Sequence, residues 1–189
     1  MKIIEVHIDK ATQAIGTTLF ADSALLNNGK PLFLPDIAKE FALKPMLAMR
    51  IGRLGKRIGR RFAYRYVDAI SPSFITTPVD SNIADHTVMQ TFDGAITVGE
   101  WVNFTPTGPY HPLPGIEWTL NGQSCASIDG NAIAPLWYDA LVHLSQFATV
   151  RMGDIVCLGI SDAKPVPVKI NDRVEASIKG KTQLKTKIK

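Results

Sequence analysis

The stretch YDALVHLSQFATVRMGDIVCLGI (138–160) joins a helical pattern to an apolar strand. Its first half continues an apolar face with the three- and four-residue spacing of a helix, formed by Leu136, Trp137, Leu141, Leu144 and Phe147. We predict a helix over residues 134–147, with Pro135 in its first turn. The second half, after Gly153 and Asp154, is continuously apolar, which is typical of a strand buried on both faces.

Most of the remaining chain has the pattern of short strands separated by turns. Asn121-Gly122 between two such segments is a strong hairpin signal. Lysines alternate along the last segment, as in an edge strand protected against further pairing. One more helix is predicted over residues 57–67. The predicted strands cover residues 3–8, 31–34, 47–51, 96–104, 116–120, 124–126, 154–159, 166–170, 173–178 and 183–188.

Length and composition favour one globular domain over residues 1–189. Hydrophobic residues make up 46% and charged residues 20%, and the formal net charge is +4. No apolar run is long enough for a membrane span, so no membrane partner is expected. The first residues lack the pattern of a secretory signal peptide, and a cytoplasmic location is therefore the expectation. The two cysteines form no CxxC motif, which disfavours a cysteine-based zinc site.

Several segments, in order, resemble the fumarylacetoacetate hydrolase family. Met152-Gly153-Asp154-Ile155 is similar to the Gly-Asp-Ile/Val strand that follows the family's last helix. The other similar segments are DSALLNNGKPLFLPD (22–36), LAMRIGRLGKRI (47–58), TFDGAITVGEWV (91–102) and WTLNGQ (118–123). The resemblance covers residues 19–189 and leaves 1–18 poorly matched. It implies a mainly β (α+β) fold, a mixed β-sandwich roll of the family's C-terminal-domain type with about two short helices.

The resemblance also implies a metal site, and this chain departs from it. Family members use Mg²⁺, Mn²⁺ or Ca²⁺, held by a Glu-x-Glu pair and an aspartate, to act on 1,3-diketones or 2-oxo acids. Those three positions fall on Lys44, Met46 and Ile75. A hard divalent cation needs oxygen ligands, and an ammonium, a thioether and a hydrocarbon supply none. We therefore predict that no metal is bound here and that no cofactor is used.

Three further positions of the family's cleft are also changed. The arginine that follows the aspartate falls on Val79, the lysine before Phe-Asp-Gly falls on Gln90, and a threonine falls on Ile160. The resemblance thus implies a degenerate cleft lined by Lys44, Met46, Ile75, Val79, Gln90 and Ile160, with no confidently assigned catalytic residue. A small anionic ligand remains conceivable there, with Lys44 as its carboxylate partner.

These observations favour a catalytically degenerate family member. It would act as a binding or scaffold protein, as a homodimer or as the silent partner of a related active chain. The alternative is an active hydrolase, isomerase or decarboxylase with a rearranged, metal-free site, in which Lys44 would act as a base or Schiff-base nucleophile. Whether the chain is an enzyme is left open at this point.

Two polar clusters offer weaker alternatives. Residues 50–65 carry seven basic residues and could track a phosphate backbone. We prefer to interpret them as the outer face of an amphipathic helix whose inner face is Phe62 and Tyr66, so nucleic-acid binding is not favoured. Asp80, Asp85, His86 and Asp93 could in principle hold a transition metal. A solvated loop is the preferred interpretation of that segment.

Overall fold

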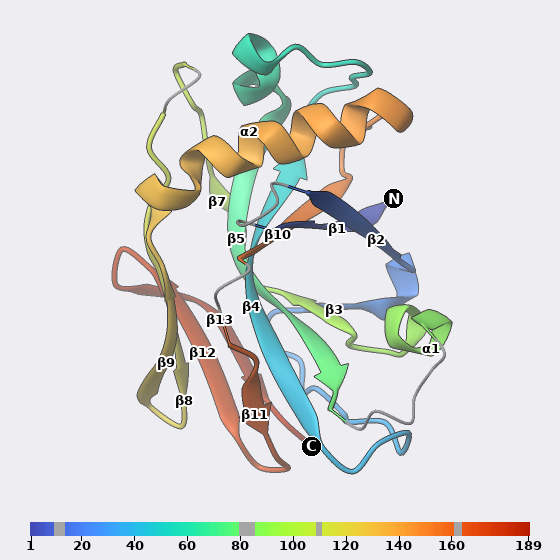
Figure 1. Cartoon of the computed structure of the whole chain (residues 1–189). Coiled ribbons are helices and arrows are strands. Elements are labelled where there is room, and N and C mark those ends of the chain that lie inside the picture. The colour runs from blue at the N-terminus through green and yellow to red at the C-terminus, as the bar shows by residue number, and fades with distance from the viewer. Residues whose placement is uncertain (10–13, 80–85, 109–110, 161–163) are drawn as a thin grey trace.

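The computed structural model describes residues 1–9, 14–79, 86–108, 111–160 and 164–189, with only the backbone described for His86 and Ile160. Its strands form two sheets (Figure 1). The larger sheet runs in the order β2 (Ile15–Phe20), β1 (Ile3–Ile8), β10 (Ile155–Ile160), β4 (Phe41–Ile51), β5 (Val67–Pro78), β6 (Ile96–Val98) and β3 (Leu25–Asn27), with β11 (Val166–Val168) beside β4 and β7 (Val102–Asn103) beside β5. The smaller sheet is β13 (Lys181–Lys187), β12 (Arg173–Ile178), β8 (Ile116–Leu120) and β9 (Gln123–Ile128).

The larger sheet is mixed, as predicted. β1 pairs with β10 in parallel and β3 pairs with β6 in parallel, whereas β4 is antiparallel to both β10 and β5. The helices are α1 (His86–Thr91), α2 (Gly130–Phe147) and two 3₁₀ segments, η1 (Asp22–Ala24) and η2 (Arg60–Tyr66). The predicted mainly β fold with few short helices is confirmed. No helix in the described part of the chain is long and apolar enough to cross a membrane.

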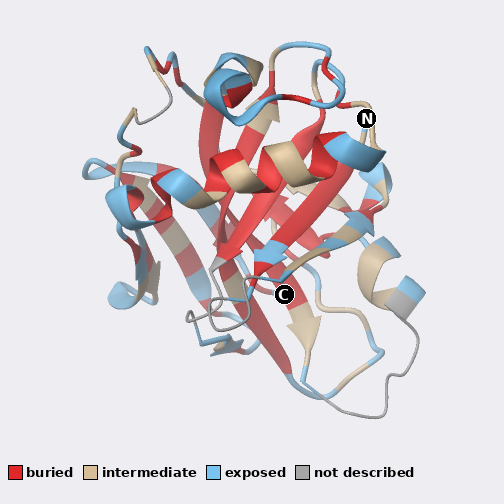
Figure 2. Cartoon of the chain, turned by 45° about the horizontal axis from the view of Figure 1, so that its top comes forward, coloured by how far each residue is buried: buried red, intermediate tan, exposed pale blue. Residues whose placement is uncertain are grey.

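Two apolar layers flank the larger sheet, because successive side chains of a strand point to opposite faces. On β4, Leu47 and Met49 belong to the main core, which packs beneath α2 and reaches the smaller sheet, while Met46 and Ala48 belong to a second core on the opposite face. Figure 2 shows the buried strands lying under α2. β10 is buried on both faces as predicted.

The quoted stretch 138–160 folds as predicted, but α2 begins earlier than expected. The helix starts at Gly130, where a β-carbon would overlap the Leu113 carbonyl. Its N-cap is Asp129, whose carboxylate accepts a hydrogen bond from the backbone N–H of Asn131 at 2.9 Å. Pro135 therefore lies inside the helix and not in its first turn. An Asp N-cap was the local signal that our prediction missed.

The turn between α2 and β10 is held by a buried carboxylate. Asp154 is 2% exposed and accepts hydrogen bonds from the backbone N–H groups of Lys2 and Arg151, each at 2.8 Å. Its carboxylate also lies 2.6 Å from the Lys2 ammonium. Desolvation favours the neutral acid, but the hydrogen bonds and charge of Lys2 outweigh it, so the pKa of Asp154 is lowered. This carboxylate ties the start of β1 to the start of β10.

Three strands were missed and one predicted strand does not form. β2, β3 and β5 were not expected, whereas residues 31–34 form no strand and Leu32 makes only an isolated bridge to Ile188. β5 contains two prolines among Ser and Thr residues (SPSFITTP). Because proline is disfavoured inside a sheet, this segment does not have the sequence pattern of a strand. The sheet accommodates them because buried hydroxyls find carbonyl acceptors, as Ser73 Oγ does at Met46 O (3.2 Å).

The predicted helix over 57–67 is shorter and differently oriented. It is the 3₁₀ segment η2, in which Ala63 is the buried residue. Phe62 is 40% exposed, so the prediction that Phe62 forms the inner face is wrong. Short 3₁₀ segments bring every third side chain into line, unlike the spacing on which the prediction relied.

The last strand is an edge strand, as its lysines predicted, since β13 ends the smaller sheet. Its outer side is nevertheless partly covered. Backbone N–H groups of Gly29, Leu32 and Leu34 donate to carbonyls of Lys185, Lys187 and Lys189 at 2.8–3.0 Å. Residues 29–34 therefore shield this edge in place of a further strand.

Candidate functional site

Lys44, Met46 and Ile75 come together on the second-core side of the larger sheet. Lys44 on β4 lies directly opposite Ile75 on β5, and Met46 lies opposite Ser73. β1 and β10 contribute Glu5 and Cys157 to the same side, paired with each other in register. We call these six residues (Glu5, Lys44, Met46, Ser73, Ile75 and Cys157) the Lys44 face.

An ion pair lies at the centre of the Lys44 face. The Lys44 ammonium donates to Glu5 Oε1 at 2.7 Å, and the two side chains are 27% and 10% exposed. Opposite charges at this distance, shielded from most of the solvent, attract strongly. The positive charge of Lys44 is thus matched within the fold, by a strand far from it in sequence.

Apolar side chains fill the rest of the Lys44 face. Met46 is 0% exposed and Ile75 is 3% exposed. Gly159 on β10 lets the Lys44 and Met46 side chains pack closely against the backbone. A β-carbon at that position would lie only 3.3 Å from the ends of both side chains. The Lys44 face is consequently a packed layer with one charge pair.

Cys157 pairs in register with Glu5, and its environment makes its thiol unreactive. Burial raises the pKa of its thiol to about 12, although a hydrogen bond with Ser73 acts in the opposite direction and the Glu5 charge adds to the rise. The thiolate is the reactive form of cysteine, so a thiol with this pKa is inert near neutral pH.

The residues present do not fit a divalent cation. Lys44, Met46 and Ile75 offer no oxygen ligand, and the one carboxylate of the Lys44 face, Glu5, already binds an ammonium. Over the described ranges of the chain, no group of three His, Cys, Asp or Glu side chains could hold a metal ion. Of the alternative cluster, Asp80, Asp85 and the His86 side chain lie outside the described residues, and Asp93 is exposed.

The other three cleft positions come from separate elements. Val79 is 53% exposed and lines an open groove of about 600 Å³ with Phe41, Leu120 and Lys169. Gln90 is on α1, where its backbone carbonyl accepts a hydrogen bond from Ala21 at 3.1 Å. Ile160 ends β10 and its backbone pairs with Ile8. The register of β4 against β5 therefore brings Lys44, Met46 and Ile75 together, and a common cleft with the other three residues stays a prediction.

Glu5 is the residue that sequence reasoning did not assign to the site. The only available signal was one carboxylate inside the apolar run IIEVHI, a strand that is otherwise almost entirely buried. A buried carboxylate requires a partner, because an unpaired charge inside a protein is costly. That signal predicts a partner without identifying it. An anionic ligand at Lys44 would have to compete with Glu5, and Lys44 as a ligand-binding residue stays a prediction.

Comparison with known proteins places these features in a family. Residues 8–189 match the family model described as fumarylacetoacetate (FAA) hydrolase C-terminal. No curated protein matches the chain.

Solved structures share the whole fold at low sequence identity. A 2-hydroxyhepta-2,4-diene-1,7-dioate isomerase from Mycobacterium marinum superposes with a TM-score of 0.84 at 19% identity, covering 99% of this chain and 73% of the other. A 5-carboxymethyl-2-hydroxymuconate delta-isomerase from Mycobacterium smegmatis gives 0.81 at 18%, covering 99% and 78%. Fumarylpyruvate hydrolase from Pseudomonas aeruginosa, solved with Mn²⁺ and pyruvate, gives 0.80 at 17%, covering 100% and 89%. These similarities concern the fold.

Proposed function

The chain belongs to the fumarylacetoacetate hydrolase C-terminal family, and on that premise we propose that it is a catalytically silent member acting as a binding or scaffold protein. It keeps the mixed sheet and the helix packed across it, and it lacks the chemical groups that the family's reaction requires. Its assembly is proposed to be a homodimer or a heteromer with a related chain, in the cytoplasm.

The observation that carries this proposal is the Lys44–Glu5 ion pair. A tethered ammonium lies where the family resemblance puts carboxylate ligands, and its own counter-ion is 2.7 Å away. A dication at the same place would be repelled by Lys44 and would find no further oxygen on Met46 or Ile75. Lys44 is the one cation of the Lys44 face, and it is already paired with Glu5, so without a metal ion this face offers no free positive charge to stabilise the enolate-like oxygen that forms in such reactions.

The first experiment measures metal binding and turnover of the purified chain. We expect no heat of binding for Mn²⁺ or Mg²⁺ and no hydrolysis of acylpyruvates or decarboxylation of oxaloacetate, with or without added metal. A tight 1:1 Mn²⁺ site, or turnover that depends on metal, would refute the proposal.

A restoration variant tests the assignment of the three positions. Lys44→Glu, Met46→Glu and Ile75→Asp in one chain should create an Mn²⁺ site, because three added carboxylates then share one sheet face with Glu5. The matched control is Lys44→Gln, Met46→Gln and Ile75→Asn, which has nearly the same shape and no negative charge. Equal Mn²⁺ binding by both variants, or by neither while both remain folded, would mean that these positions do not correspond to the family's ligands.

The alternative is a metal-free enzyme in which Lys44 forms a Schiff base with the substrate. A trapping experiment distinguishes it from the catalytically silent protein proposed above. The Lys44 ammonium is engaged in the ion pair with Glu5 at 2.7 Å, and an ammonium is not a nucleophile. We therefore expect no covalent adduct when borohydride is added with a 2-oxo acid, as judged by intact mass. An adduct present in the wild-type chain and absent from Lys44→Met would establish the alternative.

A further inference from the structure

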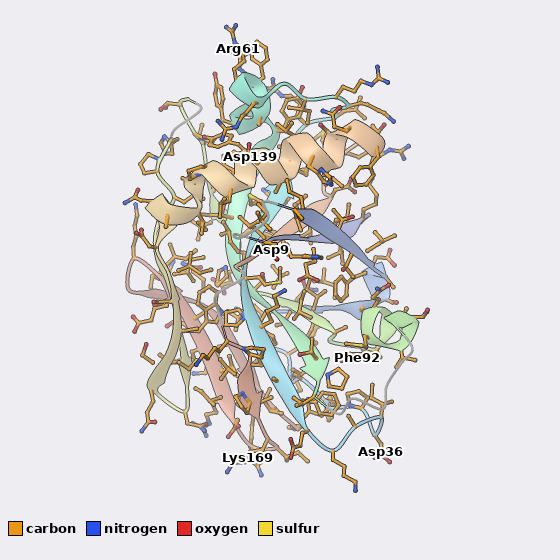
Figure 3. All side chains as sticks on the ribbon, in the orientation of Figure 1. Asp9, Asp36, Arg61, Phe92, Asp139 and Lys169 are labelled. Atoms are coloured by element: carbon orange, nitrogen blue, oxygen red, sulfur yellow. The ribbon has the colours of Figure 1, made fainter. Side chains whose placement is uncertain are left out.

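Residues 53–65 form a basic surface together with residues 147–152, a segment far away in sequence. Gly55 and Val150 form an antiparallel bridge, the backbone N–H of Arg57 donates to Ser145 O at 2.8 Å, and the Lys56 ammonium donates to the Phe147 carbonyl at 3.5 Å. The two segments therefore lie side by side at one end of the molecule. Figure 3 shows Arg61 projecting outward from this end.

The positive charges of this surface are not matched by the fold. Two neighbouring arginines are matched, since Arg50 binds Asp68 at 2.7 Å and Arg60 binds Asp139 at 2.6 Å. The others are exposed and form no ion pair with an acidic side chain in the part of the chain that the structure describes. These unmatched cations, which we call the arginine surface, are Arg53, Lys56, Arg57, Arg61, Arg65 and Arg151.

Large apolar side chains are exposed among these cations. Leu54 is 66% exposed, Met152 73%, Phe147 56% and Phe62 40%, which makes four of the ten large hydrophobic side chains exposed in the described chain. The bridge between Gly55 and Val150 brings Leu54 and Met152 to the same region. Clustered exposed apolar residues within a charged rim are typical of interaction sites.

The charges and the apolar side chains together restrict the class of molecule that could bind this surface. A second copy of this chain, docked through the same surface, would face six cations with six cations and be repelled. Single-stranded nucleic acid would need open aromatic faces for base stacking. Phe62, the exposed ring of this helical turn, already has the Arg61 and Arg65 guanidinium carbons 4.8 and 5.2 Å from its centroid, and the ring of Phe147 packs edge-to-face against His143. Leu54 and Met152 would have no role on a phosphate backbone.

We propose that the arginine surface, with Leu54 and Met152, binds an acidic segment of a partner protein in which carboxylates alternate with apolar side chains. Arginine pairs with carboxylates through two parallel hydrogen bonds, which gives such a contact its geometry. The apolar side chains of the partner then cover Leu54 and Met152. This proposal does not depend on whether the Lys44 face is catalytic.

The binding experiment uses the full chain and labelled peptides in fluorescence anisotropy at about 50 and about 300 mM salt. The test peptide interleaves Glu and Asp with Leu and Phe. One control peptide replaces Leu and Phe by Ser, and another replaces Glu and Asp by Gln and Asn. We expect the test peptide to bind more tightly than both controls, and its affinity to fall with salt. Failure of the test peptide to bind, or binding no tighter than the Ser control, would overturn the proposal.

Charge-reversal variants locate the contact. Arg61→Glu with Arg65→Glu is expected to weaken peptide binding about tenfold or more, and Leu54→Ser with Met152→Ser is expected to weaken it without changing the salt dependence. The matched control is Lys181→Glu with Lys187→Glu on β13, which makes the same change in net charge away from this surface. An equal loss in this control would mean attraction by net charge alone, and the proposal would be wrong.

Two further probes distinguish the other partner classes. A single-stranded oligonucleotide and vesicles of phosphatidylcholine with or without phosphatidylserine are titrated into the same protein. Weak binding relative to the acidic peptide is expected for both. Tighter binding to the oligonucleotide, or to the anionic vesicles, would reassign the surface to nucleic acid or to a membrane.

Discussion

The Lys44 face and the arginine surface differ in whether their positive charges have an acidic partner. Inside, the Lys44 ammonium has a carboxylate at 2.7 Å, and the apolar side chains of Met46 and Ile75 lie on the same face. Outside, six cations have no acidic partner within the described chain, although Asp68 and Asp139 show that this end of the molecule can supply one. The interior charge is neutralised by the fold, whereas the exterior charges remain available for another molecule.

The difference follows from solvation. A charge that leaves water must be compensated by a partner in the fold or it destabilises the native state, whereas water and salt stabilise an exposed charge at little cost. Interior charge pairs are therefore structural elements of this chain. The arginine surface is expected to contribute little to folding, so changing its charges should affect binding more than stability.

The largest effect is expected for Asp154, the most buried charged group of the interior. Asp154→Ala removes the acceptor of two backbone N–H groups and the partner of Lys2, and should lower the free energy of unfolding by about 3 kcal/mol. Urea unfolding of both proteins measures this.

The same variant predicts a pH dependence. Because the pKa of Asp154 is lowered in the native state, its stabilisation is fully present above the ordinary aspartate pKa of about 3.9 and is lost as pH falls through the lower native value. The stability difference between the two proteins should therefore be constant near neutral pH and shrink in acid. A difference that grows in acid would contradict this account of Asp154.

The next effect tests whether Lys44 needs its internal partner. Glu5→Leu leaves the ammonium in an apolar layer and should lower the free energy of unfolding by about 2 kcal/mol, since Lys44 is partly exposed and can still reach water. Adding Lys44→Met to that variant should recover most of the loss, because apolar pairs can replace a buried ion pair at little cost. Urea unfolding of the two variants is the measurement. No recovery in the double variant would show that the pair does more than neutralise charge.

Thiol labelling gives a smaller, local measure of how closed the Lys44 face is. Cys157 is buried with a pKa of about 12, whereas Cys125 is exposed. A disulfide reagent near pH 8 should therefore modify one thiol in the native protein and both in denaturant, with Cys125→Ser as the control that removes the native signal. Faster labelling of Cys157 in Glu5→Leu would show that the ion pair holds this face closed. Labelling of both thiols in the native wild type would contradict the packed layer.

The smallest effect is expected on the outside. Arg61→Glu with Arg65→Glu should change the free energy of unfolding by less than about 0.5 kcal/mol, because both side chains are exposed and their ring contacts, with Phe62 and for Arg65 also with Tyr64, lie at the surface. Equilibrium unfolding with the β13 control variant provides the comparison. A decrease in the free energy of unfolding as large as that expected for Glu5→Leu would contradict the proposed difference between the Lys44 face and the arginine surface.

Much of the fold was accessible from local patterns. The strands at 116–120 and 173–178 were predicted with the bounds that β8 and β12 have, and the α2–β10 passage was recognised from its periodicity. β5 was missed because its prolines and hydroxyl residues match no strand pattern locally, and only its neighbours β4 and β6 satisfy its backbone. The pairing of β5 with strands distant in sequence therefore outweighed the low strand preference of its own residues.

The site was predictable only in part. The resemblance placed Lys44, Met46 and Ile75 in one region, and the register of β4 against β5 brings these three together. Glu5 was not predicted, because no local rule relates a residue to a partner 39 positions away. The inner position predicted for Phe62 was wrong, since the 3₁₀ geometry of η2 turns that ring outward.

The sequence by itself determined the strand-rich architecture and the long helix, and it predicted the loss of oxygen ligands, because periodicity and side-chain chemistry are properties of neighbouring residues. The tertiary structure alone decided which carboxylate neutralises Lys44 and which cations remain unmatched. Both outcomes depend on pairing between distant strands, such as β1 beside β10, and on the contact of residues 53–58 with 145–152. Charge compensation is set by distance in space, and distance in space is fixed only when the whole sheet has formed.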